Sequence, residues 1–98
     1  MLWTNGNLDR EKVKKAFAVS LKRLRTYLGL TTKDLEKLTG VKVIYLNRFL
    51  RGASEPSLSQ AVIIASSFDL TVDTFVLCGL REDKLSIVTE YEIKKIKG

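Results

Sequence analysis

Residues 42–51, KVIYLNRFLR, carry the side chains with the clearest chemistry in the sequence. If this segment is a helix, a rotation of about 100° per residue places four side chains on one outward arc: Ile44, Asn47, Arg48 and Arg51. Planar amide and guanidinium groups form paired hydrogen bonds with base edges, and guanidinium also binds phosphate in this way. The pattern therefore brings three polar side chains that can form such hydrogen bonds onto one face of the segment.

The sequence has few of the residues that usually serve in catalysis or bind metal ions. The sequence has no histidine, which is the most common general base and metal ligand. The lone Cys78 is expected to be a buried apolar residue in a protein of the reducing cytoplasm. Four carboxylates are interpreted as turn and cap residues: Asp69, Asp73, Glu82 and Asp83. Without a phosphate loop, metal-ligand spacing or nucleophile motif, we expect no enzymatic activity, no metal and no small-molecule cofactor.

Composition and charge narrow the class of partner. A chain of 98 residues, 45% of them hydrophobic, can form one small domain. Its longest apolar run, residues 61–65, is far too short to cross a membrane. Residues 10–51 hold twelve Lys and Arg against three acidic residues, whereas residues 53–93 hold two against seven. The basic half favours a polyanionic partner. The alternative is that solvated helix faces simply happen to be rich in lysine. Lys22 and Arg23 are interpreted as part of such a solvated face, which would also attract phosphate.

Apolar periodicity, together with capping and glycine signals, predicts short helices. Asn7 or Asp9 can cap the first helix, and Thr31 the second. Leu35 and Leu38 are expected to face inward. Five helices are expected, over about residues 8–28, 32–39, 42–51, 58–68 and 72–78.

The C-terminal segment, residues 80–98, has two interpretations. Alternate residues from Leu85 to Ile93 are mostly apolar, which is typical of a strand. Thr89 and Glu92 have capping-box spacing, which favours a helix that begins there. We expect a short extended segment followed by a C-terminal helix.

Gly40 lies between two short predicted helices, and the second of them carries the polar arc. A sharp turn between helices needs a left-handed backbone conformation, which glycine adopts freely. Val41 can fill the junction, while Leu46, Phe49 and Leu50 face inward from the following helix.

These turn residues belong to a longer ordered pattern. Its anchors are Leu21, Leu24 and Arg25, GLT at 29–31, Leu35, Gly40–Val41, Leu46, RG at 51–52, PSL at 56–58 and LTVD at 70–73. Through this set, residues 21–77 resemble the phage repressor/Cro-like (XRE-type) helix-turn-helix domain.

The resemblance implies an all-α fold, with a compact five-helix repressor-like domain over residues 1–79. Residues 80–98 form a C-terminal extension that is a candidate dimerisation segment. Residues 42–51 would enter the major groove of double-stranded DNA. By position, four residues would read base edges: Val43, Ile44, Asn47 and Arg48. Three would contact phosphates: Thr32, Lys42 and Arg51.

The sequence departs from the usual family pattern at four positions. It has Thr32 where glutamine is usual, Glu36 where a small residue is usual, and Lys42 where Ser or Thr caps the helix. Leu50 replaces a glutamate that often pairs with the arginine at position 25. We therefore expect Glu36 to accept a hydrogen bond from Arg25 instead.

Two functions follow from these observations. The first is a repressor-like transcriptional regulator that binds duplex DNA as a homodimer, with residues 75–96 as the candidate dimer surface. The second is a protein-interaction module, an anti-repressor or adaptor, which four apolar residues of the third helix would favour: Val43, Ile44, Tyr45 and Leu50.

Overall fold

The computed structural model describes residues 8–97, which form six α-helices and no strand. The helices are α1 (Arg10–Leu28), α2 (Thr32–Thr39), α3 (Val43–Leu50), α4 (Leu58–Ser66), α5 (Val72–Gly79) and α6 (Ser86–Lys97). The predicted all-α fold is confirmed. Within residues 8–97, no helix combines the length and apolar character needed to span a membrane.

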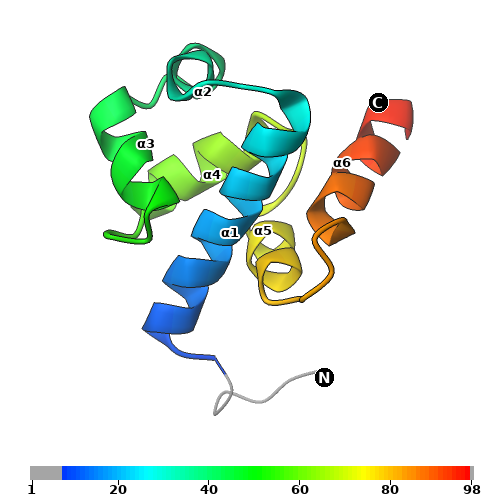
Figure 1. The fold of residues 1–98 in the computed structure, drawn as a ribbon, viewed down its shortest axis with the longest axis horizontal. Coiled ribbons are helices and arrows are strands. Elements are labelled where there is room, and N and C mark those ends of the chain that lie inside the picture. Colours follow the sequence, from blue (N-terminus) through cyan, green and yellow to red (C-terminus); the bar gives the residue numbers. More distant parts are fainter. Residues whose placement is uncertain (1–7, 98) are drawn as a thin grey trace.

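The long helix α1 runs through the middle of the molecule (Figure 1). Helices α2 and α3 lie on one side of it and α6 lies on the other, while α5 packs directly against it. The core lies where these helices meet, and its largest fully buried apolar side chains come from every helix: Leu21, Leu24, Leu35, Leu46, Ile64, Phe75 and Ile87.

The boundaries of α1 follow from its cap residues. The side chain of Asp9 accepts a hydrogen bond from the backbone N–H of Lys12 at 2.9 Å, which fixes the first turn. Gly29 ends the helix with a φ of 67°, in the left-handed region. Asn7, the other cap candidate, lies outside the described residues.

The contact between α1 and α5 is unusually close. Ser20 is fully buried in α1, and its hydroxyl donates to the carbonyl of Phe75 at 2.5 Å. One turn further along α5, a methyl group on Gly79 would lie only 1.9 Å from the carbonyl oxygen of Ala16. The absence of a side chain at Gly79 therefore allows the two backbones to touch.

In the C-terminal extension, residues 80–85 form a connection of turns and bends and residues 86–97 form one helix, α6, so the expected C-terminal helix is present but the expected extended segment is wrong. The start of α6 is fixed by Asp83, whose carboxylate accepts from the N–H of Leu85 at 2.9 Å. Thr89 lies inside the helix and does not cap it. The strand-like alternation fails because two consecutive residues, Ile87 and Val88, are both buried against the core.

Arg23 attaches the α5–α6 connection to α1. Its guanidinium group donates to the carbonyls of Cys78, Arg81 and Asp83 at distances of 3.2–3.4 Å. The interpretation of Arg23 as part of a solvated basic face is therefore wrong. A positive charge at the C-terminal end of α5 also complements the helix dipole.

Candidate nucleic-acid interface

The turn between α2 and α3 is fixed by backbone geometry and one buried hydroxyl. Gly40 has a φ of 77°, in the left-handed region. Thr39 donates to the carbonyl of Leu35 at 2.8 Å and accepts from the N–H of Val41 at 3.1 Å. Val41 is buried in the junction as expected. Leu38, expected to face inward, is 47% exposed, because Leu35 and Thr39 occupy the buried side of this short helix.

The start of α2 is held by a complete capping box. The Thr31 hydroxyl accepts from the N–H of Asp34 at 3.0 Å, and the Asp34 carboxylate accepts from the N–H of Thr31 at 2.9 Å. The backbone hydrogen bond from Thr31 lowers the pKa of Asp34 below its ordinary value. Thr32, the predicted phosphate contact, is therefore the first residue of a firmly capped helix.

The start of α3 is capped from another helix. Lys42 occupies the N-cap position but forms no side-chain cap hydrogen bond. Instead, the Glu36 carboxylate accepts from the N–H of Val43 at 3.3 Å, and Lys33 lies 3.6 Å from its other oxygen. The predicted pair of Glu36 with Arg25 is wrong, because Glu36 lies on the side of α2 that faces α3. A negative charge at this position also complements the α3 dipole.

Capping by Glu36 can be tested together with Lys42. Glu36→Ala should lower the free energy of unfolding by about 0.5–1 kcal/mol, because the first turn of α3 loses its acceptor. Lys42→Ser supplies a local cap and should raise it by about 1 kcal/mol. In the Lys42→Ser background, Glu36→Ala should then cost almost nothing. Urea denaturation followed by circular dichroism measures the wild type and all three variants, and strictly additive effects would mean that Glu36 is not the cap.

The outward face of α3 presents the predicted DNA contacts to solvent. Five of them are exposed: Lys42, Ile44, Asn47, Arg48 and Arg51. Val43 is half-buried beside Glu36. Leu46 and Phe49 are buried on the opposite side of the helix, which leaves the polar arc free.

A basic hollow lies where α1, α2 and α3 meet. Three of the predicted DNA contacts line it: Thr32, Asn47 and Arg51. Three further residues share it: Lys22, Arg25 and Leu50. The buried Nε of Arg25 has no hydrogen-bond partner within residues 8–97. Lys22 and Arg25 were not among the predicted DNA contacts, although their spacing of three residues in α1 puts them on one helix face.

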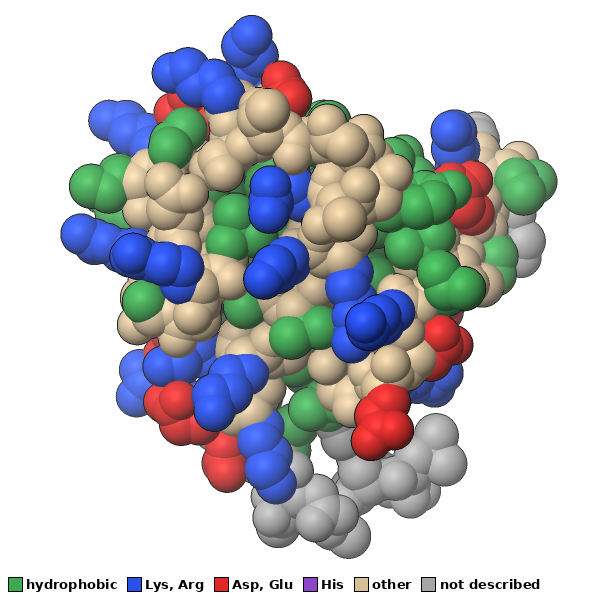
Figure 2. Space-filling view, viewed as in Figure 1, with side chains coloured by type: hydrophobic (Ala, Val, Ile, Leu, Met, Phe, Trp, Pro, Cys, Tyr) green, Lys and Arg blue, Asp and Glu red, His purple; other side chains and the backbone are tan. Residues whose placement is uncertain are grey.

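Positive charge is concentrated on the same part of the surface. In Figure 2, Lys and Arg side chains spread over α1, α2 and α3, whereas hydrophobic and acidic side chains are more prominent around α6. The uneven charge of the sequence therefore corresponds to two regions of the folded surface. A polyanion would be attracted to the region that contains α3.

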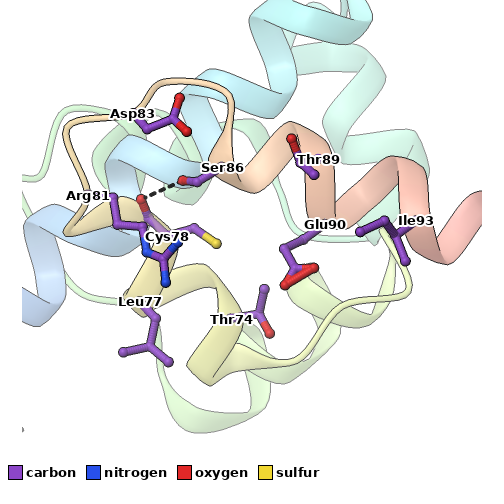
Figure 3. Close-up of a pocket in the computed structure, with 9 residues that line it drawn as sticks. All are labelled: Thr74, Leu77, Cys78, Arg81, Asp83, Ser86, Thr89, Glu90 and Ile93. Carbon is purple, nitrogen blue, oxygen red and sulfur yellow. Dashed lines mark hydrogen bonds between the residues drawn. The ribbon is translucent and has the colours of Figure 1, made fainter. Parts of the chain in front are cut away.

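A second hollow lies between α5 and α6 (Figure 3). Leu77 and Ile93 line it, and the Ser86 hydroxyl donates to the Cys78 carbonyl at 3.2 Å. Cys78 is buried as expected, and burial raises the pKa of its thiol. Phe75, the first residue of the predicted dimer surface, belongs to the core. The exposed apolar residues of this region are Leu77, Leu80, Leu85, Ile93 and Ile96.

Comparison with known families identifies the segment that contains these features. The family model described as helix-turn-helix (HTH_3) matches residues 21–75, which is more than half of the chain. No curated protein and no solved structure matches the sequence. The matched segment begins within α1, includes α2, α3 and α4, and ends within α5.

Proposed function

The chain belongs to the helix-turn-helix (HTH_3) family, and on this premise we propose that it is a repressor-like transcriptional regulator that reads duplex DNA. The observation that carries the proposal is the exposed polar arc of α3 on a region of the surface that is rich in Lys and Arg. Arg48 suits the two acceptors of a guanine, and Asn47 suits an adenine. Ile44, which is 56% exposed, suits a thymine methyl group.

Phosphate contacts would position α3 in the major groove. Thr32 at the start of α2, Lys42 at the start of α3 and Arg51 after its end surround the base-reading residues. Contacts to phosphates fix orientation and register but carry no sequence information. The proposed division of roles is therefore base reading by Val43, Ile44, Asn47 and Arg48, and positioning by the three surrounding residues.

The proposed regulator acts as a homodimer. One small domain buries little DNA surface, and tight binding by this fold usually requires two copies on a two-fold symmetric site. The exposed apolar residues of α5 and α6 support this region as the dimer surface, because it lies on the opposite side of α1 from α3. A site selected from random duplexes should therefore show two similar half-sites about 10 base pairs apart.

The DNA contacts can be tested by selecting a preferred site and measuring binding by fluorescence anisotropy at several salt concentrations. Arg48→Ala should weaken binding to the selected site by about 1–3 kcal/mol and relax the preference at one base pair. Lys42→Ala should weaken binding to all duplexes alike and lower the salt dependence by about one unit. Equal, sequence-independent losses in both variants would mean that Arg48 contacts only phosphate.

A protein-interaction module remains the second candidate. The exposed side chains of Ile44 and Tyr45, 56% and 43% exposed, place apolar surface in the middle of α3. If the protein failed to bind any duplex even at low salt, this second function would replace the first.

A further inference from the structure

We propose that the groove between α1 and the start of α6 is a docking site for an acidic amphipathic helix of a partner protein. The groove has a volume of about 470 Å³. One wall consists of residues of α1: Val19, Lys22, Arg23, Thr26 and Tyr27. The other wall consists of residues around the start of α6: Lys84, Leu85 and Val88. This second wall lies beyond residues 21–75, so the groove is not part of the matched helix-turn-helix unit.

The α1 wall gives the groove the length of a short helix. Residues 19 and 27 are eight positions apart, which corresponds to about 12 Å along the helix axis, or roughly two turns. The surface between the walls is mainly apolar, and Tyr27 and Leu85 are 50% and 62% exposed there. An open apolar groove of this length suits the apolar face of an amphipathic helix, which contacts it through side chains at i, i+4 and i+7.

Hydrogen bonds hold both walls of the groove in place. The Arg23 guanidinium donates to three carbonyls between residues 78 and 83, which fixes the connection that carries Lys84 and Leu85. The Tyr27 hydroxyl donates to the Glu92 carboxylate of α6 at 3.0 Å, so this contact joins the two walls directly. A groove that is formed before binding loses less conformational entropy when a partner docks.

The charge of the groove favours an acidic partner. Lys22 and Lys84 lie on opposite walls, and both are exposed. Within residues 8–97, neither of them forms an ion pair. Arg23 adds a third positive charge, and no lining residue is acidic. Carboxylates on both sides of a docked apolar stripe would therefore meet complementary charge.

The same charge argues against a second copy of the chain as the occupant. Two-fold symmetry would place the same groove of both copies face to face. Lys22, Arg23 and Lys84 of one copy would then lie near the same residues of the other, and like charges at an interface are unfavourable. The apolar residues of the proposed dimer surface include Leu77 and Ile93, which line a different hollow, between α5 and α6.

A pair of synthetic peptides tests the chemistry of the partner. Each peptide has about 15 residues and carries leucines at helical i, i+4 and i+7 spacing. Glutamates flank the leucines in one peptide, and lysines flank them in the other. In fluorescence anisotropy with the full chain, the glutamate peptide should bind about ten-fold more tightly or better. Equal affinities, tighter binding of the lysine peptide, or no binding of either would overturn the proposal.

Charge reversal at two positions locates the bound peptide. Lys84→Glu changes the exposed edge of the groove, whereas Arg48→Glu makes the same change on the exposed face of α3. Lys84→Glu should weaken binding of the glutamate peptide about five-fold or more, and Arg48→Glu by less than about two-fold. The opposite order would mean that the peptide binds at α3, and equal losses would mean general attraction to a basic protein. Either result would overturn the proposal.

The apolar contact is tested by two exposed leucines. Leu85 borders the groove and is 62% exposed, whereas Leu58 lies on α4 and is 80% exposed, so serine at either position should leave the fold intact. Only Leu85→Ser should weaken peptide binding, by about five-fold or more. Equal affinities of the two variants would overturn the proposal. Light scattering should show the same oligomeric state for Leu85→Ser and the wild type, and dissociation of a dimer would assign the groove to a second copy instead.

Lys22 connects the groove to DNA binding, because it also lines the basic hollow where α1, α2 and α3 meet. Acidic side chains docked beside Lys22 would lower the positive potential there, so the glutamate peptide should weaken duplex binding about three-fold or more. This consequence rests on the proposed DNA-binding function. An equal effect of the peptide on Lys84→Glu would mean competition at α3 and would overturn docking in the groove. The peptide measurements contain no DNA, so failure to bind any duplex would contradict only the proposed function.

Discussion

Replacement of Gly79 by alanine is expected to destabilise the domain by about 3 kcal/mol or more, at the upper end of the range for overpacked cores. The added methyl group would lie 1.9 Å from the carbonyl oxygen of Ala16 and 2.6 Å from its carbonyl carbon. Both obstructing atoms are backbone, so no side-chain rotation can remove the clash. Helices α1 and α5 would have to separate, and the expected result is a large loss of stability in urea denaturation.

Gly40→Ala is the matched control for this substitution. A methyl group on Gly40 would meet no atom within 4 Å, so its cost arises only from the positive φ of 77°. This cost should be about 1–2 kcal/mol, the usual penalty for an L-residue in the left-handed region. If Gly79→Ala cost no more than Gly40→Ala, the close approach of α1 and α5 would be wrong.

Replacement of Phe75 by alanine is expected to lower the free energy of unfolding by about 3–5 kcal/mol, since it opens a cavity in the core. Phe75 is fully buried, and its ring centroid lies 5.0 Å from that of Phe17 and 6.1 Å from that of Phe68. The three rings join α1, α5 and the turn that follows α4. Since small domains are stable by only about 5–15 kcal/mol, this loss removes a large part of the stability and should markedly lower the melting temperature.

Phe75→Leu separates loss of volume from loss of the ring contacts. Leucine fills more of the cavity than alanine, so we expect about half of the alanine penalty or less. Thermal denaturation of the two variants measures the difference. Equal penalties for alanine and leucine would mean that the ring contacts, and not the filled volume, account for the contribution of Phe75.

The predictable part of the fold depends on local signals. Asp9, Thr31 and Ser57 each cap the helix that follows them, because a short polar side chain can reach a free backbone N–H. Gly29 and Gly40 end helices with the positive φ that favours glycine. These signals lie within a few residues of the boundary they determine, so the sequence alone was sufficient for α1 to α5.

The parts that were not predictable depend on contacts between distant residues. The helical conformation of residues 86–88, where a strand-like pattern was expected, goes with the burial of Ile87 and Val88 against helices that are far away in sequence. Likewise, Glu36 had two possible partners, Arg25 and the N–H of Val43, and the choice depends on how α2 is rotated about its axis. The rotation of α2 about its axis cannot be derived from the types and spacing of its residues.

In the candidate interface, too, the part that depends on local signals was predictable and the part that depends on distant contacts was not. The outward arc of α3 follows from helical periodicity, and its predicted polar residues are exposed. The hollow that contains Arg25 could not be predicted, because it depends on the relative placement of three helices. The sequence did contain one signal for this hollow. Position 50 is an apolar leucine, so α3 offers Arg25 no carboxylate as a partner.

Arg23 and Arg25 lie two residues apart in α1, a rotation of about 200° around the helix axis. As a result, the guanidinium of Arg23 holds the carbonyls of the α5–α6 connection, while Arg25 lines the hollow beside α3. Two side chains from one turn of a single helix therefore contact both the α5–α6 connection and the surface that includes α3. A rotation of α1 about its axis would therefore displace both side chains at once, in opposite directions.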